Sequence, residues 1–191
     1  MNVQQMPFFT TSQCSIDFTV NRGYIVHMTD EHFMVMCLKE AHVAFDSEEV
    51  PVGAVILSPE GRVIARAHNL TRRVNRPTAH AEMLAIEMAA DAMGNYRLID
   101  CALYVSMEPC IMCAGAIIEA RIKRLVFGCF DTKGGAFGSV IDVNTLPLNH
   151  KVEVKSGVYA EKSEALLKKF FQTRRGTEVV ITGPTRNRLY V

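Results

Sequence analysis

The chain has 191 residues and a formal net charge of +1, and 49% of its residues are hydrophobic. This length and composition are typical of one globular domain with a substantial core. No apolar run approaches the roughly 20 residues that cross a membrane, the first residues do not resemble a secretory signal or a transit peptide, and the six cysteines show no disulfide-like pattern. We therefore expect a reducing compartment, the cytoplasm and/or the nucleus.

Apolar periodicity and turn residues divide the chain into a regular series of elements. In chain order, the sequence predicts a helix, two strands, a helix, a strand, a helix, two strands and a last helix, over residues 29–45, 52–57, 62–67, 80–93, 101–106, 109–120, 124–130, 152–155 and 161–175. The domain is expected at 29–175, between an N-terminal extension at 1–28 and a basic C-terminal tail at 176–191. Strands that alternate with helices favour parallel crossovers, so the predicted fold is α/β, a three-layer α/β/α sandwich around a five-stranded mixed sheet.

Particular residues set the expected ends of the helices. Thr29 is followed by two acids, which is typical of a helix start. Pro77 ends the preceding segment and Thr78 can cap the second helix, which should end before Gly94. Pro109 suits the first position of the third helix, and this would place the two cysteines that follow in its first turn. The apolar face of the last helix is expected to comprise Ala165, Leu166, Phe170 and Phe171.

A glycine-rich loop at 131–139 follows the fourth predicted strand. It lacks the Gly-Lys-Ser/Thr ending of a nucleotide-binding P-loop, so we exclude a phosphate cradle there. Both a mobile loop that approaches the substrate and a tight structural connection fit its sequence.

Two basic clusters interrupt an otherwise balanced charge pattern. Five arginines and no acid lie between Arg62 and Arg76, and six basic residues between Lys168 and Arg188 are opposed by one acid. Either cluster alone fits a solvated surface, but with two of them in one chain a partner with a phosphate backbone fits equally well.

The stretch from His80 to Cys113 organises the chain. One imidazole and two thiolates, from His80, Cys110 and Cys113, suit zinc and leave one tetrahedral position for water. The two cysteines are neighbours on a helix face, and a helix start favours thiolates. Because His80 and Glu82 are two residues apart, they can reach one target only if a second helix begins there. We predict a zinc site with these three ligands and with Glu82 beside the water.

Each half of this pattern has other interpretations. A C-x-x-C pair alone fits a redox pair or half of a structural zinc site, but the chain has no second pair. The combination of His-x-Glu with Pro-Cys-x-x-Cys resembles the signature of zinc-dependent nucleobase deaminases. Zinc with two thiolates carries little net charge, so its water needs a general base, and we assign this role to Glu82. The predicted reaction is hydrolytic deamination with release of ammonia.

Further motifs extend the similarity over most of the domain. The chain from about Asp30 to Arg175 resembles the tRNA-specific adenosine deaminases of the cytidine-deaminase-like superfamily. The segments that carry the resemblance are Glu49–Val55, Pro77–Glu82, Asn95–Asp100, Glu108–Ala116 and Phe170–Arg175. The resemblance implies conversion of adenosine to inosine at the wobble position, with the tRNA anticodon stem-loop as partner. It implies substrate contacts by Val52, Asn69, Ala81 and Asp131. It implies RNA contacts by Lys133, Arg174 and Arg175.

The resemblance also implies a dimer. Bacterial members of the family are homodimers, whereas the eukaryotic catalytic subunit pairs with an inactive paralogue that lacks the catalytic glutamate. The extension at 1–28 and the basic tail are more similar to the eukaryotic subunit, so a heterodimer is expected first and a homodimer second. Two other functions stay open: a deaminase of free nucleosides or nucleotides with the same zinc site, and a silent RNA-binding subunit, against which Glu82 argues.

Overall fold

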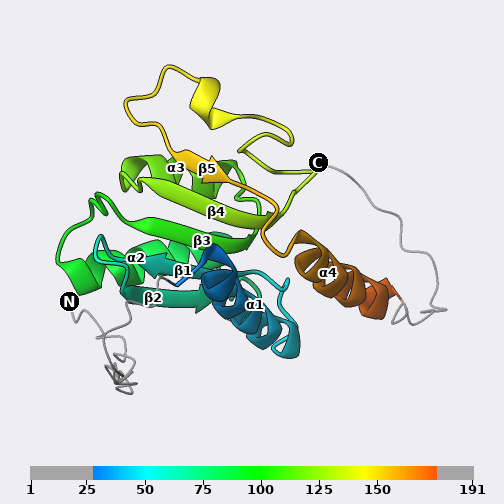
Figure 1. Cartoon of the computed structure of the whole chain (residues 1–191). Helices are drawn as coiled ribbons and strands as arrows, with labels where there is room; N and C mark the ends of the chain where they lie inside the picture. Colours follow the sequence, from blue (N-terminus) through cyan, green and yellow to red (C-terminus); the bar gives the residue numbers. More distant parts are fainter. Residues whose placement is uncertain (1–27, 176–191) are drawn as a thin grey trace, which may run out of the picture.

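The computed structural model describes residues 28–175, so the predictions for the N-terminal extension and for the tail at 176–191 lie outside the described residues (Figure 1). The elements are α1 (Asp30–Asp46), β1 (Gly53–Leu57), β2 (Val63–His68), α2 (Ala81–Met93), β3 (Ala102–Met107), α3 (Ile111–Glu119), β4 (Arg124–Cys129), the 3-10 turn η1 (Val143–Thr145), β5 (Glu153–Lys155) and α4 (Ala160–Arg175). Within the described part of the chain, none of the helices has the length and apolarity needed to cross a membrane.

The five strands form one mixed sheet in the order β2-β1-β3-β4-β5. β1 is antiparallel to both β2 and β3, whereas β3, β4 and β5 are parallel. The central strands β1, β3 and β4 are buried almost throughout, which explains why their sequences are continuous apolar runs and not alternating ones. The predicted α/β class and the five-stranded mixed sheet are confirmed.

Helices cover both faces of this sheet. Alternate residues of a strand point to opposite faces, so Val55 of β1 packs in the cluster that α1 supplies, while its neighbour Ile56 packs in the cluster of α2 and α3. α4 packs beside α1, where the rings of Phe45 and Phe170 are 5.9 Å apart. The result is the expected three-layer arrangement.

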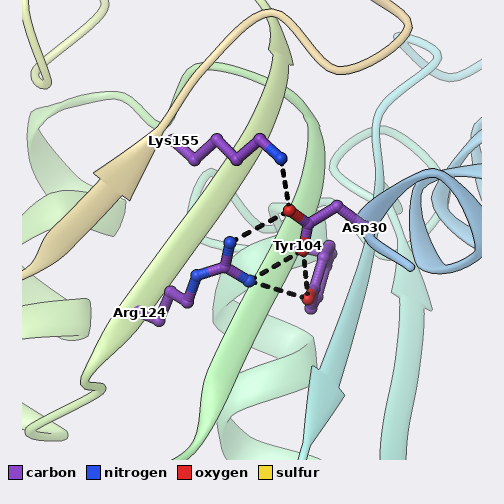
Figure 2. Close-up of polar contacts among 4 residues, drawn as sticks. All are labelled: Asp30, Tyr104, Arg124 and Lys155. Atoms are coloured by element: carbon purple, nitrogen blue, oxygen red, sulfur yellow. Dashed lines mark hydrogen bonds and ion pairs between the residues drawn. The ribbon is translucent and has the colours of Figure 1, made fainter. Parts of the chain in front are cut away.

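A polar cluster anchors the first turn of α1 to three strands (Figure 2). The Asp30 carboxylate accepts two hydrogen bonds from Arg124 at 2.7 and 3.0 Å, one from Lys155 at 2.6 Å and one from Tyr104 at 2.8 Å. The Arg124 guanidinium is the main reason why the pKa of Asp30 lies well below its usual range. The prediction treated Asp30 only as an acid of a helix start, because its partners are far away in sequence.

Two helices begin one or two residues later than predicted, and the predicted cap of the second is wrong. α2 begins at Ala81 and its N-cap is His80, not Thr78. Thr78 is still part of the preceding loop, where its carbonyl accepts a hydrogen bond from the His80 N–H at 2.8 Å. α3 begins at Ile111, so Pro109 lies before the helix and not at its first position.

The start of α3 is delayed by a neighbouring loop. Cys110 has extended backbone and forms an isolated β-bridge with Gly135, and the Pro109 carbonyl accepts a hydrogen bond from Ala136 at 2.9 Å. Cys110 is therefore the N-cap of α3, and only Cys113 lies in the first helical turn.

The buried face of α4 also differs from the prediction in part. Ala165 and Phe171 are exposed, and the buried residues recur at the spacing of one helix face; they are Ser163, Leu166, Leu167 and Phe170. Phe170 and Phe171 are both apolar, so the sequence does not show which of the two packs against the sheet. The predicted face therefore included Phe171, which is exposed, next to the buried Phe170.

Candidate metal centre

Three side chains from two helix starts meet at one point beyond the carboxyl end of β3. The Cys110 and Cys113 sulfurs are 3.6 Å apart, and His80 Nδ1 lies 3.7 Å from Cys110 Sγ and 3.6 Å from Cys113 Sγ. Ligands about 2.3 Å (sulfur) and about 2.0 Å (nitrogen) from a tetrahedral zinc are about 3.5–3.8 Å from one another. The three donor atoms thus already have the spacing of a zinc site, and the structure brings together the three residues predicted to bind it.

The two N-cap positions explain how the ligands converge. His80 and Cys110 both have extended backbone at the ends where α2 and α3 leave their free N–H groups. The hydrogen bond with the Cys113 thiol lowers the pKa of Cys110 to about 3, and the same bond raises the pKa of Cys113. The contact with Cys110 raises the pKa of His80. A divalent cation in place of the proton between the sulfurs would leave both cysteines as thiolates, so these residues fit zinc.

Glu82 lies in the first turn of α2 and is 3% exposed. It does not belong to the group of three ligand atoms, although its carboxyl group contacts the Cys113 side chain. Burial raises the pKa of Glu82, because an ionised carboxylate loses its hydration there. A carboxyl group with a raised pKa next to the ligands is able to accept a proton and to return it.

Asn69 forms hydrogen bonds with two other residues, Val52 and Ala81, for which the resemblance implies substrate contacts. Its Oδ1 accepts a hydrogen bond from the Ala81 N–H at 2.8 Å, and its backbone N–H donates to the Val52 carbonyl at 3.1 Å. Its side-chain amide also donates to the Val50 carbonyl at 3.1 Å. Val52, Asn69 and Ala81 are all buried. Asn69 therefore fixes the start of α2 against β1, and direct contact with a substrate stays a prediction.

Sequence reasoning missed Glu108, a buried carboxylate that fastens the loop at 131–139. The Glu108 carboxylate accepts hydrogen bonds from the backbone of Asp131 at 3.0 Å, Phe137 at 2.9 Å and Ser139 at 3.1 Å, and from the Ser139 hydroxyl. A Cβ atom at Gly135 would lie 2.3 Å from the carboxylate, so only glycine fits there. Of the two interpretations of this loop, the tight connection is the one the structure shows.

Asp131 and Lys133 lie at the beginning of this loop. The Asp131 carboxylate accepts a hydrogen bond from the Lys133 backbone at 3.0 Å, which makes a local turn, and Lys133 is exposed. The backbone of the loop also contacts Cys110 through its bridge with Gly135. The loop thus lies against the metal ligands, as the predicted substrate role requires, and the substrate contact itself stays a prediction.

Glu49 is a second buried glutamate that sequence reasoning missed, and it fastens the loop before His80. It is 1% exposed and accepts hydrogen bonds from the backbone of Arg72 at 2.8 Å and Arg73 at 2.7 Å, and from the Thr71 hydroxyl at 3.2 Å. The only available signal was position: each glutamate is the first residue of a segment that carries the family resemblance.

The predicted RNA-binding arginines of α4 lie outside the metal centre. The Arg174 guanidinium stacks on the Phe170 ring at 4.7 Å and donates to the Glu48 carbonyl at 2.7 Å, and Arg72 donates to the same carbonyl at 3.1 Å. These residues line a cleft of about 540 Å³. Arg175 follows at the end of α4. Arg174 therefore holds α4 to the neighbouring loop, in addition to any contact with RNA.

Comparison with known proteins agrees with the geometry. Residues 27–129 match the family described as the cytidine and deoxycytidylate deaminase zinc-binding region. The chain is 46% identical over 147 residues to a tRNA-specific adenosine deaminase of Bacillus subtilis, which covers 76% of this chain and 91% of the relative. It is 47% identical over 145 residues to a protein of the same name from Agrobacterium fabrum, which covers 75% and 95% of the two chains.

Solved structures give the same result. A structure from a study of A-to-I editing by tRNA:A34 deaminases at the wobble position of transfer RNA is 47% identical in sequence and has a TM-score of 0.69. The match covers 71% of this chain and 99% of that one. A guanine deaminase from Nitrosomonas europaea, 23% identical with a TM-score of 0.62 over 74% of this chain and 84% of that chain, shares the fold.

Proposed function

The chain belongs to the tRNA-specific adenosine deaminase family of the cytidine-deaminase-like superfamily, and from this membership we propose that it converts adenosine to inosine at the wobble position of tRNA anticodons. The observation that carries the proposal is the triangle of His80, Cys110 and Cys113 with buried Glu82 beside it. The identity to relatives named tRNA-specific adenosine deaminases, over nearly their whole length, supports tRNA as the substrate.

The reaction replaces the exocyclic amine of adenine by oxygen, so adenosine and water give inosine and ammonia. His80, Cys110 and Cys113 would hold the zinc ion, which when bound lowers the pKa of a water molecule. Glu82 accepts one proton of the attacking water and passes it to the ring nitrogen, and it then transfers the second proton, from the new hydroxyl group on the ring carbon, to the departing amine. Burial raises the pKa of Glu82, so its carboxylate accepts a proton more readily than an exposed carboxylate would.

The test is a direct assay of the purified chain, with its zinc content measured. Incubation with tRNA should give inosine at position 34, read by reverse transcription as guanosine, whereas free adenosine and cytidine should be poor substrates. Glu82→Ala is the matched control, because it should keep zinc and tRNA binding but not the reaction. Faster turnover of free nucleosides than of tRNA would contradict the proposal and favour a nucleoside deaminase.

We further propose that the enzyme acts as a dimer in the cytoplasm and/or nucleus. The extension at 1–28 and the basic tail support an inactive paralogous subunit as the partner. The alternative partner is a second copy of this chain, and the similarity to bacterial relatives supports this homodimer. Sizing of the purified chain and its activity without any partner separate the two. A fully active homodimer would rule out the heterodimer.

A further inference from the structure

A basic cavity lies at the amino ends of the parallel strands, at the end of the sheet opposite to the metal centre. It has a volume of about 490 Å³ and is lined by residues that precede β3, β4 and β5, namely Arg97, Ile99, Asp100, Arg121, Lys123 and His150. The metal ligands follow the other end of β3, which is six residues long. At about 3.3 Å per residue, roughly 20 Å separate the two sites.

The charges of this cavity are not balanced within the protein. Lys123 pairs with Asp100 at 3.2 Å, and both side chains are more than half exposed. Among the residues that the structure describes, neither the Arg97 nor the Arg121 guanidinium has an ion-pair or hydrogen-bond partner; Arg97 only stacks on Tyr96 at 5.3 Å. Two guanidinium groups with free donors in one cavity are therefore available to an anion.

The backbone at Arg121 adds an independent observation. Arg121 is the residue after the C-cap of α3, with a φ of 59°, and its N–H donates to the Ile118 carbonyl at 3.0 Å. The next N–H, of Ile122, donates to the Ile117 carbonyl at 3.2 Å, which completes a Schellman motif. Glycine is the favoured residue at this position, so the chain places a charged side chain where the backbone conformation disfavours one.

We propose that this cavity binds a phosphate group of a nucleotide, as a second contact for the RNA substrate far from the base that is deaminated. Guanidinium groups match phosphate oxygens in pairs of hydrogen bonds. Exposed Ile99 lines the cavity and provides an apolar surface that a base or ribose can contact, which bare inorganic phosphate does not need. The RNA assignment rests on the proposed function; a free nucleotide has the same chemistry.

The test compares the double variant Arg97→Ala/Arg121→Gly with wild type. Arg121→Gly removes the charge at a site that favours glycine, so the melting temperature should be retained or rise by about 2–4 °C. Affinity for full-length tRNA should fall. Because one phosphate contact is lost, the ratio of variant to wild-type Kd should shrink about threefold between 50 and 200 mM salt. The single-turnover rate at saturating tRNA should not change.

The control variant Lys39→Ala/Lys162→Ala removes the same charge from α1 and α4 and should leave the salt dependence as in wild type. A titration with AMP identifies the source of the phosphate: saturable binding that the double variant loses, with tRNA affinity unchanged, would assign the cavity to a free nucleotide. Unchanged tRNA affinity together with no AMP binding would overturn the proposal. A chain that does not deaminate tRNA at all would contradict the proposed function, and the AMP titration would still test the cavity.

Discussion

Replacement of Glu108 by Gln should loosen the loop at 131–139 without removing the metal centre. In the native protein, each carboxylate oxygen accepts two hydrogen bonds: Oε1 from Phe137 and Ser139 N–H groups, and Oε2 from the Asp131 N–H and the Ser139 hydroxyl. An amide has only one oxygen, but the Ser139 hydroxyl can rotate and accept a hydrogen bond from the NH₂ group. The amide oxygen should therefore occupy the Oε1 position, where it still accepts from the Phe137 and Ser139 N–H groups, and the Asp131 N–H is left facing the NH₂ group. Each lost bond to a charged acceptor is worth about 1.5–3 kcal/mol.

The loss of this one bond gives about 1.5–3 kcal/mol, and we expect the lower end because water can reach the loop once it opens. The loop lies at the surface, so the cost should appear as local opening and not as global unfolding. About 1.5 kcal/mol corresponds to roughly tenfold faster hydrogen exchange at the Asp131 amide. Zinc content should remain about one per chain, whereas affinity for tRNA should fall because Asp131 and Lys133 move with the loop.

Native-state hydrogen exchange measures this effect directly. Glu119→Gln is the matched control, since it makes the same chemical change at an exposed position of α3 and should alter neither exchange nor affinity. Unchanged protection of the Asp131 amide in Glu108→Gln would refute the reasoning, because its hydrogen bond to Glu108 would then contribute nothing to the loop.

Three further outcomes are expected. Cys110→Ala should lose both zinc and activity, and a variant with normal metal content would show that Cys110 is not a ligand. Glu82→Ala should keep its zinc and bind tRNA while the single-turnover rate falls by about 10²–10⁴, and a fall in metal content would place Glu82 among the ligands instead. Asp30→Asn should lower the free energy of unfolding at neutral pH by about 1–3 kcal/mol, the low end because Arg124 is one-third exposed. Because the folded-state pKa of Asp30 is depressed, this difference should be constant above about pH 4 and should shrink as the pH falls further; a urea series in which it does not shrink would contradict the assignment.

The elements and the metal ligands were predictable because their signals are local. Apolar runs and helical spacing located all five strands and all four helices within a few residues. His80, Cys110 and Cys113 were identifiable because few other functions require that combination of side chains.

What the sequence could not reveal depends on contacts between distant segments. Asp30 contacts Tyr104 and Arg124, which lie 74 and 94 positions along the chain. The delayed start of α3 depends on Gly135, which bridges to Cys110 from the loop beyond β4. No local pattern separates a buried glutamate that accepts hydrogen bonds, such as Glu108, from an exposed one.

These long-range contacts also explain why the ligands are in place. His80 and Cys110 are N-caps, so only their carbonyls belong to the hydrogen-bond ladders of α2 and α3, where they accept from the Leu84 N–H at 3.0 Å and the Ala114 N–H at 2.8 Å. Further support comes from outside the helices: Asn69 binds the first N–H of α2, and the loop that Glu108 fastens pairs with Cys110. The same two contacts connect the metal centre to the segments expected to meet RNA. Substrate contacts and metal geometry therefore share their supports, and a change in either loop should affect both tRNA affinity and the alignment of the ligands.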